Sequence, residues 1–366
     1  MDSGVHEKGA WRVILQVVML LGYLYLFLLS IDMMGASMKM FGKGFTENLI
    51  ASTSNPLVGL FIGVLATSLI QSSSTTTSIV VGLVGGGALT VPNAIPIIMG
   101  ANIGTSVTNT LVALANMNRF SEFRRSFAAS IVHDFFNFLS VLVLFPLQYF
   151  TNFLGFSSGF MADAFQHVGG LSYLNLVKAI TKPVVHLISG LVNNIAWMLL
   201  LIAVAFLFIA LRQIVTTLRH LVLKKAETLF DKVLFKTALR AFFVGLLLTV
   251  SVQSSSVTTS LLIPFAGAGL LTLAQIYPFT LGANVGTTIT AVLASLVTGQ
   301  ILAVQVAFAH VLFNFSGIAI WYPLKKVPIK LAEAFAGMAT RNRVYPILYI
   351  LVMFFIIPSL LIWILR

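Results

Sequence analysis

Two short runs of hydroxyl-bearing residues each interrupt a strongly apolar part of the chain. Residues 71–78 read Gln-Ser-Ser-Ser-Thr-Thr-Thr-Ser, and residues 253–260 read Gln-Ser-Ser-Ser-Val-Thr-Thr-Ser. Hydroxyl groups donate and accept hydrogen bonds, and glutamine adds an amide donor and a carbonyl acceptor. Such groups can surround an anion or a small hard cation. Two copies of one run suggest two halves of a molecule that meet around one polar site.

The two runs belong to a longer internal repeat. When Gly63 is aligned with Gly245, 63–105 falls on 245–287 without a gap, and 20 of these 43 positions are identical. The match includes Gly-Ala-Asn-Ile-Gly-Thr at 100–105 and Gly-Ala-Asn-Val-Gly-Thr at 282–287. After a shorter loop in the second half, the residues His133, Asn137 and Pro146 match His310, Asn314 and Pro323. Shared Gly, Pro, Asn and His positions indicate a true duplication rather than a shared composition.

The composition indicates an integral membrane protein. Hydrophobic residues make up 58% of the 366 residues and charged residues only 9%, whereas soluble domains carry about 25% charged residues. A bilayer crossing needs roughly 20 apolar residues. Uncharged stretches of this kind lie at 13–31, 192–211 and 344–365, and further apolar stretches lie at 127–150 and 300–324. We therefore expect an all-α, multi-pass protein of the cell inner (plasma) membrane, in contact with the lipid bilayer.

The net charge of +12 comes from basic residues in three loops, at 119–125, 212–240 and 325–343, and not from an aromatic-studded face. We therefore expect no nucleic-acid partner. The positive-inside rule places these loops in the cytoplasm and the weakly charged segment 151–191 outside. The crossings between the loops then bring the two repeats in from opposite sides, which predicts two inverted-topology repeats.

This topology divides the chain into four parts. We expect the N-terminal helix and first inverted repeat at 1–150, an outer connecting loop at 151–191, the second inverted repeat at 192–324, and an interfacial segment with a C-terminal helix at 325–366. In each repeat the Gln-Ser-Ser-Ser run predicts a re-entrant hairpin with a broken helix, buried in protein or lining a cavity. The N–H groups at a half-helix N-terminus favour an anion, and freed carbonyl oxygens favour a small cation.

Asp134 lies inside the apolar stretch 127–150, where an ionisable residue is costly and functional by default. The alternative is a carboxylate that reaches the interface and pairs with Arg124 or Arg125. The matching position in the second half is Val311, so Asp134 breaks the symmetry. The neighbouring His133 and its match His310 could carry protons, although we prefer neutral histidines that are hydrogen-bonded between helices.

The paired runs, residues 100–109, the Glu-Phe-Arg-Arg stretch at 122–125 and the His-Asp-Phe-Phe-Asn stretch at 133–137 closely resemble the type II sodium-dependent inorganic phosphate cotransporters. The resemblance extends from about Leu57 to Pro323. It implies a secondary transporter that imports HPO₄²⁻ with Na⁺ by alternating access. It implies no enzymatic activity, no cofactor apart from Na⁺ as the coupling ion, and no transition metal. The short, cysteine-free outer segment suggests a compact bacterial member.

The resemblance and the repeat together predict the binding residues. Those expected at phosphate are Gln71, Ser72, Ser73, Ser74, Gln253, Ser254, Ser255, Ser256, Asn102 and Asn284. Those expected at sodium are Gln253, Ser254, Thr287, Thr290, Gln71, Thr105, Asp134 and Ser130. Asp134 matches the position that carries Asp in electrogenic members of the family, which predicts a ratio of three Na⁺ to one phosphate. Ser130 departs from the alanine that those members tend to have.

Both runs lack Lys and Arg, so Na⁺ must supply much of the charge that neutralises a bound dianion. Three other functions fit parts of this pattern. A sodium-coupled transporter of another oxyanion, such as sulfate, would need no acceptor for the proton of HPO₄²⁻. A phosphate-permeable channel would ignore the sodium gradient. An intramembrane serine hydrolase would need a nucleophile on a strained turn and an oriented base, and the duplication would give it two half-sites without purpose.

Overall fold

The computed structural model describes residues 3–114, 119–218, 235, 237–342 and 344–365, and within these ranges the chain forms helices and no strands. Seven helical segments among them are long and apolar enough to cross a membrane: Leu15–Phe41, Val91–Leu114, Phe120–Thr151, Ala196–Thr217, Leu273–Thr298, Ile301–Trp321 and Val344–Leu365. An all-α protein with several candidate membrane spans was predicted and is confirmed. The sequence did not predict the spans at 91–114 and 273–298, because their Gly-Ala-Asn blocks lower their mean hydropathy.

Two N-terminal helices, α1 (Ser3–Phe41) and α2 (Lys43–Ser52), precede the first repeat. The first repeat contains α3 (Pro56–Ile70), α4 (Ser73–Gly85), α5 (Val91–Gly104), α6 (Val107–Leu114) and α7 (Phe120–Thr151). The second repeat follows α10 (Ala196–Leu218) and contains α12 (Ala238–Val252), α13 (Ser255–Ser260), α14 (Leu262–Gly267), α15 (Leu273–Thr298) and α16 (Ile301–Trp321). Helices α3 and α12 begin and end at equivalent positions of the sequence repeat.

The segment between the repeats, predicted as an outer connecting loop, contains helices; its location outside the membrane stays a prediction. It consists of α8 (Phe153–Phe165), the π-helix η1 (Gln166–Gly170) and α9 (Leu171–Leu191). After the second repeat come α17 (Lys326–Ala339), α18 (Val344–Leu351), the π-helix η3 (Val352–Ile356) and α19 (Ile357–Leu365). The basic residues Arg219, Lys224, Lys225, Lys232 and Lys236, which contributed to the predicted topology, lie outside the described residues.

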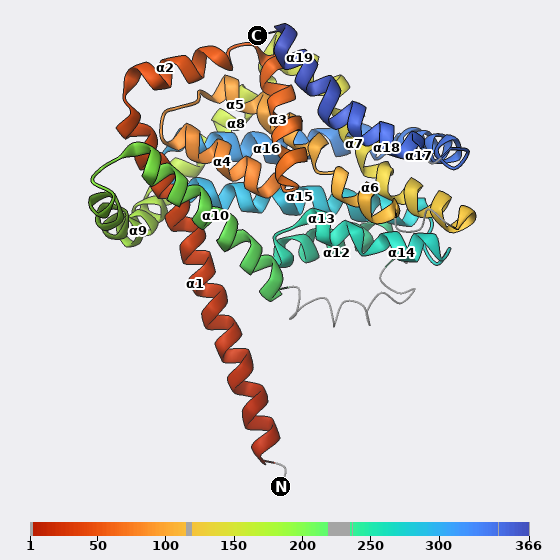
Figure 1. The fold of residues 1–366 in the computed structure, drawn as a ribbon, viewed down its shortest axis with the longest axis horizontal. Helices are drawn as coiled ribbons and strands as arrows, with labels where there is room; N and C mark the ends of the chain where they lie inside the picture. Colours follow the sequence, from red (N-terminus) through yellow and green to blue (C-terminus); the bar gives the residue numbers. More distant parts are fainter. Residues whose placement is uncertain (1–2, 115–118, 219–234, 236, 343, 366) are drawn as a thin grey trace.

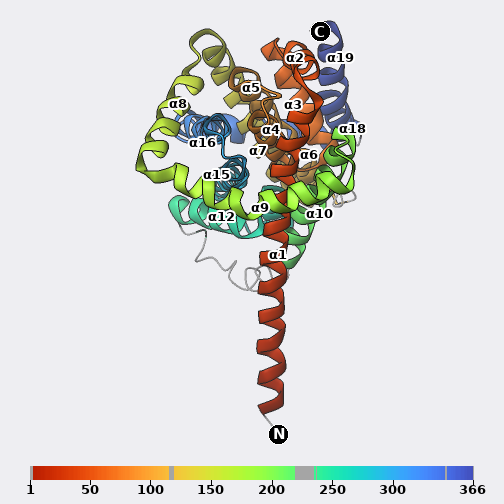
Figure 2. The ribbon, with the colours of Figure 1, turned by 90° about the vertical axis from the view of Figure 1, so that its left-hand side faces the viewer.

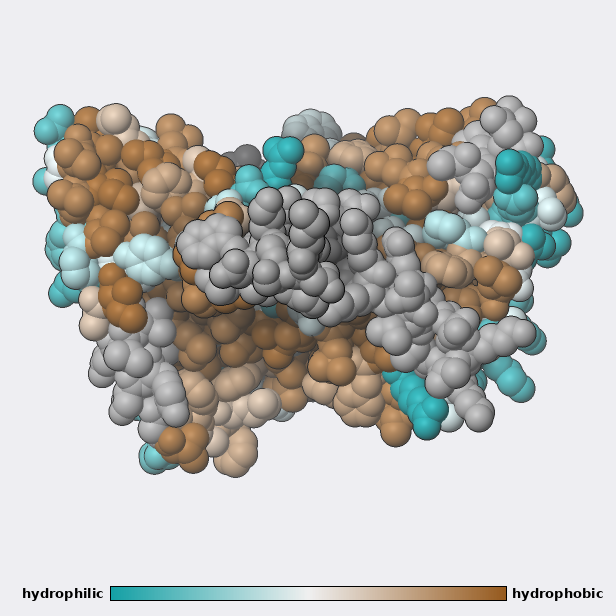
Figure 3. Space-filling model, turned by 90° about the horizontal axis from the view of Figure 1, so that it is seen from below, coloured by the Kyte–Doolittle hydropathy of each residue, from teal (hydrophilic) through white to brown (hydrophobic). Residues whose placement is uncertain are grey.

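Helices α15 and α16 run side by side through the middle of the molecule in Figure 1 and are seen end-on in Figure 2. Helix α10 packs against α1, whose N-terminal part projects from the body in both views. Figure 3 shows broad apolar areas on the surface seen from below. Leu142, Phe150 and Trp363 are 69%, 81% and 78% exposed, which suits a surface in contact with lipid chains.

The same two helices pack closely in each repeat, α3 against α5 and α12 against α15. Glycine makes this approach possible. A Cβ atom on Gly100 would overlap the carbonyl oxygen of Leu60, and one on Gly282 would overlap that of Phe242. Because these two contacts are related by the repeat, backbone lies against backbone at equivalent places in both halves.

The two repeats differ in which helix is interrupted. The returning arm of the first repeat is the single helix α4, whereas that of the second is divided at Leu261 into α13 and α14. Pro264 provides the reason, because it has no N–H to donate to the carbonyl of Ser260. The matching residue in α4 is Gly82. Conversely, α5 and α6 are separated at Thr105 and Ser106, whereas α15 continues through the equivalent positions.

Candidate functional site

Each Gln-Ser-Ser-Ser run forms the same tight turn between two helices. Gln71 ends α3 in the left-handed region with φ 59° and ψ 26°, and Gln253 ends α12 with φ 56° and ψ 27°. The next residue is extended in both runs and caps the following helix through its side chain. The Ser72 hydroxyl accepts from the Thr75 N–H at 3.2 Å, and the Ser254 hydroxyl accepts from the Val257 N–H at 3.3 Å. The predicted helix break is therefore present twice with nearly identical geometry.

The two turns lie next to each other in the folded chain. The Ser74 hydroxyl donates to the backbone carbonyl of Gln253 at 3.5 Å. Ser73, Ser74 and Ser255 are 4%, 3% and 3% exposed. The first N–H groups of α4 and α13 have no carbonyl acceptor within their own helices. Those of Thr75 and Val257 are capped by serine hydroxyls, and the earlier ones remain as donors at the start of each helix. Two helix N-termini and their serine hydroxyls can hold an anion without a basic side chain.

Each glutamine side chain accepts a hydrogen bond from a threonine later in its own repeat, on α6 in the first and on α15 in the second. The Thr108 hydroxyl donates to Gln71 Oε1 at 2.8 Å, and the Thr290 hydroxyl donates to Gln253 Oε1 at 2.7 Å. This contact joins two residues that we predicted at sodium, Gln253 and Thr290. Thr108 was not among the predicted residues, although the register of the repeat pairs it with Thr290.

Thr105 and Thr287 lie one turn before these threonines. Each hydroxyl donates at 3.1 Å to the carbonyl four residues earlier, that of Ala101 or Ala283. Both side chains are buried, with 3% and 2% exposed. Of the predicted sodium residues, Gln253 and Ser254 form the turn, Thr290 bonds Gln253, and Thr287 lies one helical turn before Thr290. Gln71 and Thr105 occupy the equivalent places in the first half.

Asn102 and Asn284 belong to a buried network that crosses between the repeats. His133 Nε2 lies 2.5 Å from Asn284 Oδ1, and His310 Nε2 lies 3.4 Å from Asn102 Oδ1. Asn137 joins the two pairs, because it donates to the Asn102 carbonyl at 2.9 Å and accepts from Asn284 Nδ2 at 2.9 Å. The structure therefore places these asparagines beside histidines, as our preferred interpretation of the histidines required. Within the described part of the chain, no hydrogen bond joins either asparagine to a Gln-Ser-Ser-Ser run.

Asp134 is completely buried, and its Oδ2 atom accepts a hydrogen bond from the Tyr349 hydroxyl at 2.9 Å. The alternative of an interfacial pair with Arg124 or Arg125 is wrong, because the carboxylate lies in the interior and contacts a tyrosine instead. Ser130 lies one turn before Asp134 on α7 and is also fully buried, but its hydroxyl donates to its own helix, at the Phe127 carbonyl. Tyr349 was not predicted as a neighbour of Asp134, because it lies in the C-terminal segment, outside the repeat.

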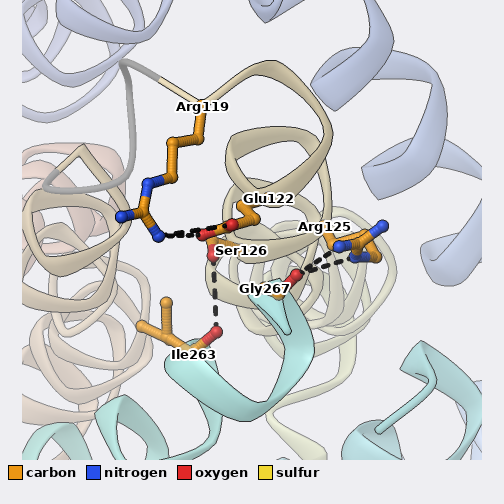
Figure 4. A network of polar contacts seen from close by, with 6 residues as sticks. All are labelled: Arg119, Glu122, Arg125, Ser126, Ile263 and Gly267. Atoms are coloured by element: carbon orange, nitrogen blue, oxygen red, sulfur yellow. Dashed lines mark hydrogen bonds and ion pairs between the residues drawn. The ribbon is translucent and has the colours of Figure 1, made fainter. Parts of the chain in front are cut away.

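Arg125 instead anchors the second hairpin, as Figure 4 shows. Its Nε and Nη2 atoms donate to the Gly267 carbonyl at 2.8 and 2.5 Å, at the C-terminal end of α14. The Ser126 hydroxyl donates to the Ile263 carbonyl at 3.4 Å in the same helix. A guanidinium at a helix C-terminus is favourable because it satisfies a free carbonyl and complements the helix dipole. The first turns of α7 thereby hold the returning arm of the opposite repeat.

The hydrolase alternative gains little from the structure. The sequence Gly-Phe-Ser-Ser-Gly at 155–159 matches the Gly-x-Ser-x-Gly pattern of hydrolase nucleophiles. That pattern is meaningful on a sharp strand-to-helix turn, whereas residues 155–159 lie inside α8. The Gln-Ser-Ser-Ser serines, in turn, occupy the cap and first turn of their helices.

Comparison with known proteins gives a consistent result. Residues 26–174 and 206–342 match the family described as Na+/Pi-cotransporter. Sodium-dependent phosphate transport protein 2B of Homo sapiens is 35% identical over 444 residues, which cover 94% of this chain and 64% of that protein. Protein 2A of Rattus norvegicus is 36% identical over 429 residues, which cover 95% and 67%. Protein 2B of Pongo abelii is 35% identical over 467 residues, which cover 98% and 68%. No solved structure matches the chain.

The chain spans about two thirds of the length of these relatives. The family match includes both Gln-Ser-Ser-Ser turns, the histidine–asparagine network and Asp134. The predicted bacterial origin stays a prediction. The predicted family is confirmed: because the family match covers most of the chain, the chain belongs to the Na+/Pi-cotransporter family.

Proposed function

We propose that this protein imports inorganic phosphate, as HPO₄²⁻, together with Na⁺. The observation that carries the proposal is the contact between the two Gln-Ser-Ser-Ser turns, at Ser74 and Gln253. At this contact the N-terminal turns of α4 and α13 meet, and their serine side chains are buried. Relatives that are about 35% identical along most of this chain are named sodium-dependent phosphate transport proteins, which supports the same substrate here.

Sodium has a physical role at this site. Both turns lack Lys and Arg, and a buried dianion without a compensating charge is costly. Helix N-termini and hydroxyls stabilise it only in part. Na⁺ ions beside Gln253 and Thr290, and beside Gln71 and Thr108, supply the missing positive charge. Phosphate therefore binds tightly only when Na⁺ is already bound, and the transport of each solute depends on the presence of the other.

Transport follows an alternating-access cycle in this proposal, with the two repeats in inverted orientation in the cell inner (plasma) membrane. The 13 residues of α4 and the 15 of α12 form apolar helices shorter than the seven candidate spans. This length supports re-entrant hairpins, which enter the bilayer and return to the same side. The anchor of Arg125 on Gly267 lets α7 move together with the opposite hairpin.

Asp134 makes the cycle electrogenic in this proposal. Its carboxylate is buried in α7, and Val311 replaces it in the second half. A third Na⁺ bound there gives a stoichiometry of three Na⁺ to one phosphate, so that one net positive charge enters per cycle. A membrane potential of 100 mV then adds about 2.3 kcal/mol of driving force.

The test is uptake of labelled phosphate into proteoliposomes that contain the purified protein, with an imposed gradient of Na⁺, K⁺ or H⁺. We expect accumulation only with the Na⁺ gradient, and competition by arsenate but not by sulfate. Uptake without any sodium dependence would indicate a channel. Strong competition by sulfate would indicate a different oxyanion substrate.

A further inference from the structure

Tyr349, in the C-terminal segment, makes a polar contact with the buried carboxylate of Asp134 on α7. It lies on α18, and its hydroxyl donates to Asp134 Oδ2 at 2.9 Å. The tyrosine is 9% exposed and the aspartate fully buried. A hydrogen bond to an ionised carboxylate is roughly twice as strong as one between neutral groups. The contact has this strength when a cation bound beside Asp134 keeps the carboxylate ionised.

The tyrosine ring is held in place by aromatic neighbours. Its centroid lies 4.9 Å from that of Phe335 on α17 and 5.6 Å from that of Phe354 in η3. Phe335 in turn lies 6.1 Å from Phe127, on the same helix as Asp134. Edge-to-face and tilted contacts of this kind favour defined ring positions. The hydroxyl therefore approaches the carboxylate from a fixed direction.

The bond to Tyr349 leaves the other carboxylate oxygen available. Asp134 Oδ1 faces the hydroxyl of Ser106, which is fully buried and close enough to interact with the carboxylate, although neither atom has a hydrogen bond of standard geometry among the described residues. Ser106 stands at the interruption between α5 and α6. The Asp134 carboxylate and the Ser106 hydroxyl therefore lie together beside the break between α5 and α6.

The chemistry of the donor also matters. A Lys or Arg in the place of Tyr349 would bring its own positive charge and repel a cation at Asp134. A neutral phenol fixes the carboxylate without neutralising it. A phenylalanine would leave the carboxylate free to rotate, and ordering it upon ion binding would then cost free energy.

We infer that Tyr349 is a positioning residue for cation binding at Asp134, so that the C-terminal helix controls the affinity of this one site. The inference rests on the proposed function, in which Asp134 binds the third Na⁺. Tyr349 orients Oδ1 toward the α5–α6 interruption and does not itself contact the ion. The second half has neither the carboxylate nor this contact, so the control acts on the electrogenic step alone.

The test compares the full-length protein with Tyr349→Phe in proteoliposomes, measuring phosphate uptake and the accompanying current over a range of Na⁺ concentrations. We expect the Na⁺ concentration for half-maximal current to rise about tenfold, as the loss of one hydrogen bond to a charged group requires. The phosphate concentration for half-maximal uptake at saturating Na⁺ should stay unchanged. Tyr345→Phe is the matched control, because Tyr345 is 46% exposed on the same helix and should behave as the original protein.

Introducing Tyr349→Phe into an Asp134→Gly background separates positioning from general destabilisation. The substitution should then have no further effect on the Na⁺ dependence of uptake. A shift of the same size without the carboxylate would overturn the inference, and so would a Na⁺ dependence of Tyr349→Phe equal to that of the original protein. If the original protein shows no sodium-driven uptake, the proposed function itself fails. The two failures are therefore distinguishable.

Discussion

The helix with the Gly-Ala-Asn block is interrupted in the first repeat and continuous in the second. In the first repeat, α5 ends at Gly104 and α6 begins at Val107, beside the buried Asp134. In the second, α15 runs unbroken from Leu273 to Thr298, and Val311 stands where the aspartate would be. The turns at Gln71 and Gln253, by contrast, have nearly the same backbone angles.

This difference separates two tasks of the duplicated scaffold. A site that surrounds a dianion with helix N-termini benefits from two equivalent halves, and the turns have kept that equivalence. A site for one additional cation needs a negative charge in only one half. Asp134 provides that charge, and the break between α5 and α6 places the Ser106 hydroxyl beside it. The second repeat, with a valine and an intact helix, offers neither.

The largest effect is expected where the two halves are most alike. Replacing Gly100 or Gly282 by Leu should prevent folding in both cases, because the side chain would overlap the backbone of the neighbouring helix. The cost should exceed about 3 kcal/mol. Yields of monodisperse protein in detergent and thermal unfolding would measure it. Gly22→Leu is the control, since no atom lies within 4 Å of the position of its Cβ. A well-folded Gly282→Leu protein would show that the close packing is confined to the first half.

The second prediction concerns the position where the halves differ. Asp134→Gly should abolish the current that phosphate evokes while sodium-dependent uptake continues, because only the third Na⁺ is lost. Recording current and labelled uptake from the same vesicle preparation gives the ratio of charge to phosphate. Ser158→Ala is the control and should preserve the current, because this buried hydroxyl lies on α8 and bonds its own helix at the Gly155 carbonyl. Persistent current in Asp134→Gly would remove the aspartate from this role.

A third prediction asks whether both halves bind sodium beside their glutamines. Thr108→Val and Thr290→Val each remove a hydroxyl that contacts a glutamine oxygen, and each should raise the Na⁺ concentration for half-maximal uptake about tenfold. Thr216→Val is a control, because its hydroxyl bonds only its own helix on an exposed face. A normal Na⁺ dependence in Thr108→Val would restrict this kind of site to the second half.

The smallest effect is expected at the helix caps. Ser72→Ala and Ser254→Ala each remove one side-chain acceptor at a helix N-terminus, which costs about 1 kcal/mol. Thermal unfolding in detergent should show the larger decrease for Ser72→Ala, because the Ser72 hydroxyl also accepts from the Thr75 hydroxyl at 2.9 Å, whereas Val257 has no hydroxyl to donate to Ser254. Equal decreases would mean that this additional hydrogen bond adds nothing to stability.

The sequence alone predicted much of this molecule. Its composition indicated a helical membrane protein, because a chain with so few charges lacks the polar surface of a soluble domain. The internal repeat identified two equivalent turns, since a left-handed Gln followed by a capping Ser is a local arrangement that depends on a few neighbouring residues. The motifs also predicted the family, and Asp134 was notable as a charge in an apolar stretch.

The tertiary structure decided which groups meet. The crossing of the repeats places Asn102 and Asn284 beside His310 and His133, and their predicted role at phosphate stays a prediction. Thr108 acquired its partner through helix packing, and Tyr349 reached Asp134 from a segment that contains no part of the repeat. Contacts of this kind join residues far apart in the chain, so neither periodicity nor spacing specifies them. The physical reason is that local hydrogen bonds are set by adjacent residues, whereas the environment of a buried charge depends on every helix that packs around it.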